Sequence, residues 1–271
     1  MASKATISGA DELFYGRGYN GYAADFWGRK GARVMIPTYV SLGTPGVADA
    51  DYLIRAATST ELPNAETVTY LATATDASPH DAAAATTTIY ANGAAVTAWD
   101  VRDGATYGRN LVGVATHSTD VVAMTVLISG YDYAFQPMSQ LLDFPALGTN
   151  TTLTATGTKA FAYVTSIAIT SALNAEANTL NIGTGVRLGL PFALSDTDHF
   201  IKAAFGGVQE LINVASNATV YAAVTSTATT TSGDVRGTIS FNATLDGTEC
   251  TAWYYVSGHS TGAGVYGVAQ A

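Results

Sequence analysis

Val121-Val122-Ala123-Met124-Thr125-Val126-Leu127-Ile128-Ser129 is the stretch that decides the fold class. Its even-numbered positions are all large and apolar, whereas its odd-numbered positions mix small, polar and apolar side chains. A period of two is typical of a β-strand that buries one face. The sequence therefore predicts a strand here, with its even-numbered side chains in a core.

A second strand is predicted over residues 160–169. Its large side chains fall on one side and mostly small ones on the other; the large ones are Phe161, Tyr163, Ile167 and Ile169. Between the two strands lie residues that end strands rather than continue helices, namely Gly130-Tyr131-Asp132, Gln136-Pro137 and Leu147-Gly148-Thr149-Asn150. The expected arrangement is two strands on either side of a turn-rich crossing.

Asn92-Gly93 is the strongest local turn signal in the chain. Thr88-Ile89-Tyr90-Ala91 leads into it and Ala94-Ala95-Val96-Thr97 leads out. A two-residue type I′ turn would pair Thr88 with Thr97 and Ile89 with Val96. We predict a β-hairpin in this register.

The rest of the chain shows short strand patterns broken by turns. Strands are expected near 67–73, 110–116, 180–182, 220–224, 239–241 and 251–256, with a polar loop over 100–109 and tight turns over 183–192. Residues 198–215 fit either a short helix capped by Asp198 or a hairpin around Gly206-Gly207. The aromatic residues of these strands are expected to lie in the core, Trp253 and Tyr255 among them. This pattern predicts an all-β chain of sandwich or jelly-roll type.

The composition is poor in charge. Only 12% of the 271 residues are charged, and the formal net charge is −9. A weakly charged, apolar-leaning surface favours a protein that hides much of its outside in an assembly, although a single rigid domain with a Thr-rich exterior gives similar numbers. Nucleic acid is not an expected partner, because phosphate binding needs a cationic footprint. A membrane is not expected either, because no apolar run approaches the length of a spanning helix, and without a signal-peptide core the chain is expected to be made in a cytoplasm.

The first 50 residues differ in texture from the rest of the chain. Gly alternates with aromatic and basic residues there, and neither strand nor helix periodicity holds. We interpret 1–50 as an extended arm and 51–271 as the sandwich, with a division into two β subdomains near 145–150 left open. The arm either packs on its own domain or docks on a neighbouring subunit, and RNA binding is a weaker third option because arginines are sparse. The candidate interface residues are Tyr15, Arg17, Tyr19, Tyr22, Phe26, Trp27 and Arg29.

Catalytic and cofactor signals are weak throughout. The four histidines, His80, His117, His199 and His259, have no second His or Cys at zinc-ligand spacing, and the glycines at 183–185 lack the βαβ context of a dinucleotide site. We therefore expect no catalytic site, metal or cofactor. A triad using Asp196 or Asp198 with His199, and a carboxylate pair drawn from Glu61, Glu66, Glu176, Glu210 and Glu249, stay open. Cys250, the only cysteine, is expected to be a packed thiol.

Turn and strand motifs over roughly 110–256 resemble those of small virion structural proteins of tailed bacteriophages. The motifs are Ser129-Gly130-Tyr131-Asp132, Gln136-Pro137-Met138-Ser139-Gln140, Gly157-Thr158-Lys159-Ala160-Phe161, Val164-Thr165-Ser166-Ile167, Ile182-Gly183-Thr184-Gly185, Leu188-Gly189-Leu190-Pro191, Gly233-Asp234-Val235-Arg236-Gly237-Thr238 and Leu245-Asp246-Gly247-Thr248. The residues before 50 lie outside the resemblance.

The resemblance implies a capsid decoration or cement role. Such a protein sits on the surface of the virion, binds the major capsid protein, bridges capsomers and often forms a homotrimer. Two other functions stay open from the residues alone. One is a glycan- or receptor-binding module of a fibre, spike or surface layer, which would use exposed aromatics as sugar platforms. The other is a β-sandwich glycosidase or esterase, which needs a pocket with convergent acids or a triad.

Overall fold

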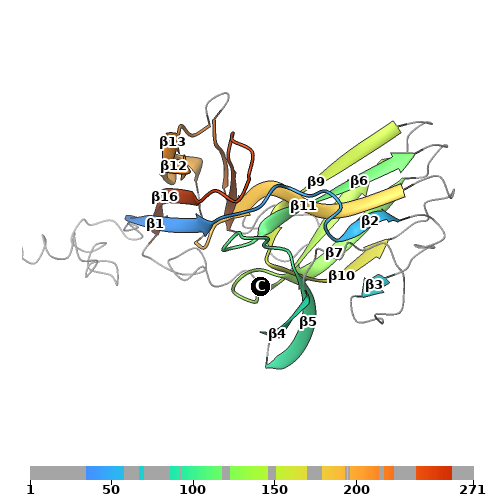
Figure 1. The fold of residues 1–271 in the computed structure, drawn as a ribbon. Helices are drawn as coiled ribbons and strands as arrows, with labels where there is room; N and C mark the ends of the chain where they lie inside the picture. The colour runs from blue at the N-terminus through green and yellow to red at the C-terminus, as the bar shows by residue number, and fades with distance from the viewer. Residues whose placement is uncertain are drawn as a thin grey trace, which may run out of the picture.

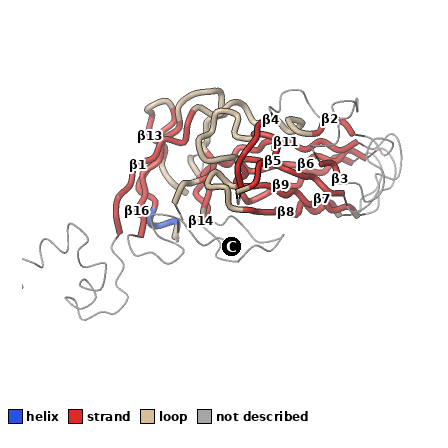
Figure 2. Tube along the Cα trace, turned by 90° about the horizontal axis from the view of Figure 1, so that it is seen from below, coloured by secondary structure: helices blue, strands red, loops and turns tan. Residues whose placement is uncertain are grey.

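The fold is built almost wholly of strands. The computed structural model describes residues 35–57, 67–69, 86–91, 93–117, 123–145, 151–169, 179–192, 194, 196–213, 217–222 and 236–257. Within these ranges there are sixteen strands, no α-helix and one 3-10 helix, Thr197–His199, which Figure 2 shows beside β16. The predicted all-β, sandwich-like class is confirmed.

The strands form three antiparallel sheets (Figure 1). The end sheet has the order β1 (Met35–Gly43), β16 (Cys250–Ser257), β12 (Phe200–Phe205), β13 (Val208–Glu210). The shared sheet has the order β14 (Thr219–Ala222), β15 (Gly237–Ser240), β11 (Thr179–Gly189), β6 (Arg109–His117), β9 (Thr151–Phe161), with β2 (Ile54–Ala57) also on β11. The hairpin sheet has the order β4 (Thr86–Ala91), β5 (Ala94–Asp100), β10 (Tyr163–Ile169), β7 (Met124–Tyr131), β8 (Pro137–Phe144), with β3 (Thr67–Thr69) also on β10.

The main core lies between the shared sheet and the hairpin sheet. Met124, Val126 and Ile128 of β7 point into it, as the alternation in the sequence predicts, and β7 is buried at every second residue. From the opposite layer come Leu111 of β6 and Leu180 of β11. Two sheets that bury one face each against the other form a sandwich.

A second core lies between the end sheet and the β14–β15–β11 side of the shared sheet. Val40 and Tyr254 of the end sheet meet Leu188, Val220 and Ile239 of the shared sheet there. Strand β11 serves both cores, because its first half contributes to the main core and Leu188 to the second. Both cores draw on strands from before and after the proposed division near 145–150, of which 146–150 lie outside the described residues.

The predicted strand over 160–169 is wrong in one respect, because it is two strands that belong to different sheets. β9 ends at Phe161 on β6, and β10 begins at Tyr163 on β7. Ala162 makes the crossing, and its N–H donates to the Tyr131 carbonyl at 3.0 Å. Phe161 therefore lies in the main core, whereas Tyr163 packs in a separate small cluster with Ile89. A sheet change of this kind cannot be read from alternation.

One turn prediction is confirmed and one is wrong. β7 ends at Tyr131 and β8 begins at Pro137, so the turn between them falls where Gly130-Tyr131-Asp132 and Gln136-Pro137 predict it. The glycines predicted to form tight turns over 183–192 lie inside β11, which runs to Gly189. Gly183 is needed there because a Cβ atom would collide with the backbone of Asp49 and Ala50, so the glycine signals close backbone approach rather than a turn.

Several local predictions are confirmed. The β4–β5 hairpin pairs Thr88 with Thr97 and Ile89 with Val96, in the predicted register, and Gly93 has a φ of +79°. Residues 198–215 form the hairpin alternative, β12 and β13, around Gly206-Gly207. The hairpin β4–β5 projects from the body at the bottom of Figure 1.

The predicted arm, 1–50, is described from residue 35 onward. Strand β1 falls within it and pairs with β16 from Met35 opposite Ser257 to Gly43 opposite Cys250. Val40 and Leu42 lie in the second core. Residues 35–43 are thus an edge strand of the end sheet, and residues 1–34 lie outside the described part of the chain.

Candidate functional site

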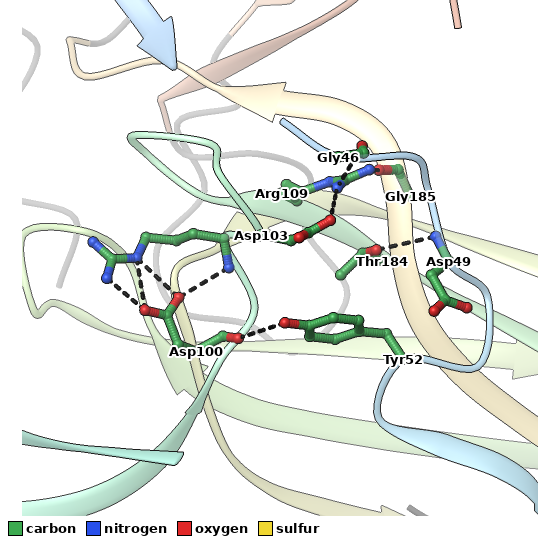
Figure 3. A network of polar contacts seen from close by, with 9 residues as sticks. Gly46, Asp49, Tyr52, Asp100, Asp103, Arg109, Thr184 and Gly185 are labelled. Carbon is green, nitrogen blue, oxygen red and sulfur yellow. Dashed lines mark hydrogen bonds and ion pairs between the residues drawn. The ribbon is translucent and has the colours of Figure 1, made fainter. Parts of the chain in front are cut away.

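The densest polar network surrounds Arg109 of β6 (Figure 3). The Arg109 side chain is fully buried, and its Nε and Nη2 donate to the Gly185 carbonyl at 3.1 and 2.8 Å. Its Nη1 donates to the Gly46 carbonyl and to Asp103 Oδ2, both at 3.0 Å. Burial lowers the pKa of the Arg109 guanidinium, while the negative charge of Asp103 raises it. This arginine fastens two loops to β11 through strong charge-assisted bonds.

The same network holds the loop before β2 against β11. The Asp49 N–H donates to Thr184 Oγ1 at 3.2 Å, and the Tyr52 hydroxyl donates to the Asp100 carbonyl at 3.5 Å (Figure 3). Burial, followed by the charges of Asp103 and Asp100, raises the pKa of the Tyr52 hydroxyl. The tyrosine is therefore kept neutral and acts as a donor that ties the loop down.

A buried ion pair joins the shared sheet to the hairpin sheet where the two cores meet. Arg236 Nε lies 3.0 Å from Asp132 Oδ2, with both side chains almost wholly buried. Arg236 Nη1 also donates to the Pro191 carbonyl at 2.8 Å, and Asp132 Oδ1 accepts from the N–H groups of Ala134 and Gln136 at 2.8 and 2.9 Å. A cavity of about 10 Å³ beside the pair has room for about one water molecule. The space is too small for a substrate.

Asp196, Glu210 and Cys250 are held in structural roles. The Asp196 carboxylate accepts from the Asp198 N–H at 3.0 Å and caps the 3-10 helix, and Glu210 accepts from the N–H groups of Asn242 and Ala243. Burial and nearby carboxylates raise the pKa of the Cys250 thiol to about 12. In the described part of the chain no three His, Cys, Asp or Glu side chains gather as metal ligands. His80, His259, Glu61, Glu66 and Glu176 lie outside it.

The outer face of the end sheet carries exposed aromatic side chains, Tyr39 and Tyr255. Alternation in β1 and β16 turns one set of side chains into the second core and the other set outward. We call the outward set of this sheet the aromatic face; it comprises Pro37, Tyr39, Ser41, Lys202, Gln209, Trp253 and Tyr255, with the buried residues Ala204 and Thr251 between them. The expectation that Trp253 and Tyr255 lie in the core is therefore wrong, because Trp253 is only partly buried and Tyr255 is 40% exposed.

Three side chains form the centre of the aromatic face. Tyr39 and Trp253 are cross-strand partners whose ring centroids lie 4.7 Å apart at 53°, and Tyr39 is 53% exposed. On the other side of Trp253, Lys202 Nζ lies 4.4 Å from the indole centroid. A tyrosine, a tryptophan and a cation in a row across three strands form a rigid, amphipathic surface of the kind that anchors protein interfaces.

The edge and one end of the end sheet carry polar features. Strand β1 is an edge strand, and Pro37 near its start has no N–H to donate to an added strand. At the other end of the face, the Ser41 hydroxyl donates to exposed Glu249 at 3.4 Å. The aromatic face thus has aromatic rings and Lys202 at its centre and exposed Glu249 at one end.

The residues that sequence reasoning chose as interface candidates lie in a different part of the chain. All seven, from Tyr15 to Arg29, fall outside the described residues. The aromatic face was missed in the sequence because both sets of residues in β16 are mostly apolar, which hides the alternation.

Known proteins give no guide to the site. Comparison with protein-family models, curated proteins and solved structures finds nothing that this chain matches. Among the described residues, no helix has the length and apolar content to cross a membrane.

Proposed function

We propose that this chain is a non-enzymatic structural protein of a phage virion, of the capsid decoration or cement type. It would bind the major capsid protein at the capsid surface and stabilise the head lattice as a homo-oligomer. The observation that carries the proposal is the aromatic face. Trp253, Tyr39 and Tyr255 present aromatic surface on a rigid sheet that has a complete core on its other side.

The interior supports a role in adhesion. Each buried charge described above joins strands and loops to one another: Arg109 binds two loops and β11, and Arg236 binds across the two cores. Such staples give a stiff body, which loses little conformational entropy when it is captured in a contact. A stiff body with an aromatic face is suited to holding neighbouring subunits together.

Adhesion would act through many weak contacts. On a lattice, each copy that leaves one neighbour is still held by the others, so detachment requires several contacts to open together. The low charge of the chain, 12% of residues, reduces the desolvation cost of packing copies closely.

Cryo-electron microscopy of virions purified from the culture that produces this chain tests the proposal. The expected map places the chain on the outside of the head, in register with the capsid symmetry, with the aromatic face against another subunit. Virions that lack the chain, or that carry it with the aromatic face turned to solvent in every copy, would contradict the proposal.

A second candidate is a glycan- or receptor-binding module, and the exposed rings of Tyr39 and Tyr255 beside Trp253 favour it. Sugar rings stack on exposed aromatic side chains as other apolar faces do. A glycan array probed with the full chain, and with Trp253→Ser beside it, separates this function from self-assembly. Binding by the wild type that disappears in the variant supports glycan recognition. If the wild-type chain binds no glycan on the array, the glycan-binding function is contradicted.

A further inference from the structure

We propose that the occupant of the aromatic face is residues 1–34 of a neighbouring copy of this chain, so that copies are linked by exchanged arms. This inference rests on the proposed function and names the partner of its contact surface. Three observations support it: the point where the described chain begins, the chemistry of residues 1–34, and the charge of the face.

The described chain begins at the rim of the face itself. Met35 is the first residue of β1 and lies opposite Ser257, at the end of the β1–β16 ladder. Figure 1 shows this end of β1 on the side of the end sheet away from β6 and β9, with the strand running from there toward the body. A segment that continued the line of β1 back from Met35 would point away from the body, and it would have to reverse its direction to lie on its own face.

The reach of the segment fits a neighbour. Thirty-four residues span up to about 110 Å when extended. A compact protein of 271 residues has a radius of gyration of about 18 Å. An arm of residues 1–34 that is only partly extended is therefore long enough to reach a neighbouring subunit.

The composition of residues 1–34 matches the aromatic face. The segment holds aromatic residues at 14, 15, 19, 22, 26 and 27, with glycines between them that permit close approach to a sheet. Aromatic side chains from the segment can pack against Tyr39, Trp253 and Tyr255 in offset or edge-to-face geometry. Arginines at 17, 29 and 33 can lie over the exposed rings of the face.

Charge favours the same pairing. Residues 1–34 hold five basic and three acidic residues, whereas the whole chain has a formal charge of −9. The arm is thus positive and the remainder strongly negative. Exposed Glu249 at one end of the face offers a negative contact for a basic arm.

Hydrogen exchange with mass spectrometry on the full chain tests the inference. We expect amides within residues 1–34 to be protected in the wild type, and the protection to rise with protein concentration. Trp253→Ser, which removes the centre of the face, should lower the affinity of the arm about 30-fold and with it the protection at a given concentration. The matched control is Tyr90→Ser, which removes an aromatic ring that is 73% exposed on β4, far from the end sheet in the pairing order, and should leave arm protection unchanged.

A second variant addresses the arm itself. Trp27→Ser in the full chain should reduce protection of residues 1–34 and also expose Trp253 to a collisional quencher of tryptophan fluorescence. Arm amides that exchange equally fast in the wild type and in Trp253→Ser would overturn the inference. Protection that does not change with concentration would also overturn it, because the arm would then lie on its own subunit.

Particle binding separates this inference from the function on which it rests. If virions carry the chain while its arm exchanges freely, arm exchange is wrong and the decoration role stands. If the arm is protected in a concentration-dependent manner while virions lack the chain, the arm exchange is right and the decoration role is wrong.

Discussion

Removal of the Arg236 side chain should be among the most damaging single changes outside the hydrophobic cores. Asp132 and Arg236 have side chains that are 5% and 6% exposed, and their charged atoms lie 3.0 Å apart. In Arg236→Ala the Asp132 carboxylate stays buried without its cation, which typically costs about 3–5 kcal/mol. For a chain of this size, this loss lowers the melting temperature by about 6–20 °C.

Urea unfolding and thermal melts of Arg236→Ala and two comparison variants test this expected loss of stability. Arg55→Ala breaks the exposed pair with Asp51, in which the arginine is 57% exposed, and should cost at most about 1 kcal/mol. The double variant Asp132→Asn/Arg236→Met removes both charges and keeps a carbonyl acceptor for the turn amides, so it should recover much of the loss. A loss in Arg236→Ala no larger than that in Arg55→Ala would refute the view that this ion pair staples the two sheets.

Three other outcomes are expected from the interior. Gly183→Ala should destabilise the protein by about 1–3 kcal/mol or more, because the added methyl group collides with the backbone at Asp49. Gly207 lies in an open turn at positive φ, so Gly207→Asn should change the free energy of unfolding little. Equal melting temperatures for the two variants would contradict this. Tyr254→Phe should cost about 1–2 kcal/mol in urea unfolding, because the Tyr254 hydroxyl is bonded at 3.1 Å to both the N–H and the carbonyl of Phe192; an unchanged midpoint would contradict it. The pKa of the Cys250 thiol is raised from 9.0 to about 12, so the thiol should resist thiol reagents at pH 8 in the native state. Its contribution to stability should be complete below pH 9 and should decline as the pH rises toward 12, by up to about 1.4 kcal/mol per pH unit. If the free energy of unfolding of Cys250→Ala falls with alkaline pH as steeply as that of the wild type, this prediction is contradicted.

The local part of the fold could be predicted from the sequence because its determinants are local. Asn92-Gly93 sets a two-residue turn, and that turn sets the register of Thr88 with Thr97. The alternation through Met124 to Ile128 identifies the buried face of β7 because every even-numbered position is large and apolar, whereas the other face mixes Leu127 with polar residues. Where one residue type dictates one backbone geometry, the pattern is sufficient.

The failures share a different cause, which is contact between distant segments. Ala162 changes sheets because Tyr131 and Val101, far away in the chain, bond to its backbone. Gly183 lies in a strand because a loop at Asp49 packs against it, and nothing near Gly183 in the sequence reports that loop. Both positions have the small residues of a turn, but for reasons of close packing.

The site was missed for a related reason. In β16 the inward residues Ala252, Tyr254 and Val256 and the outward residues Trp253 and Tyr255 are all apolar, so hydrophobicity does not say which set faces solvent. Only the pairing of β16 between β1 and β12, with the second core on one side, settles the direction.

Sedimentation velocity over a concentration series tests most directly whether copies of this chain self-associate through the aromatic face. We expect the weight-average sedimentation coefficient of the wild-type protein to rise with concentration. Tyr39→Ser/Trp253→Ser should stay a monomer over the same range and melt within a few degrees of the wild type. A wild type that sediments as a monomer throughout, or a double variant that assembles as readily, would contradict adhesion through this face.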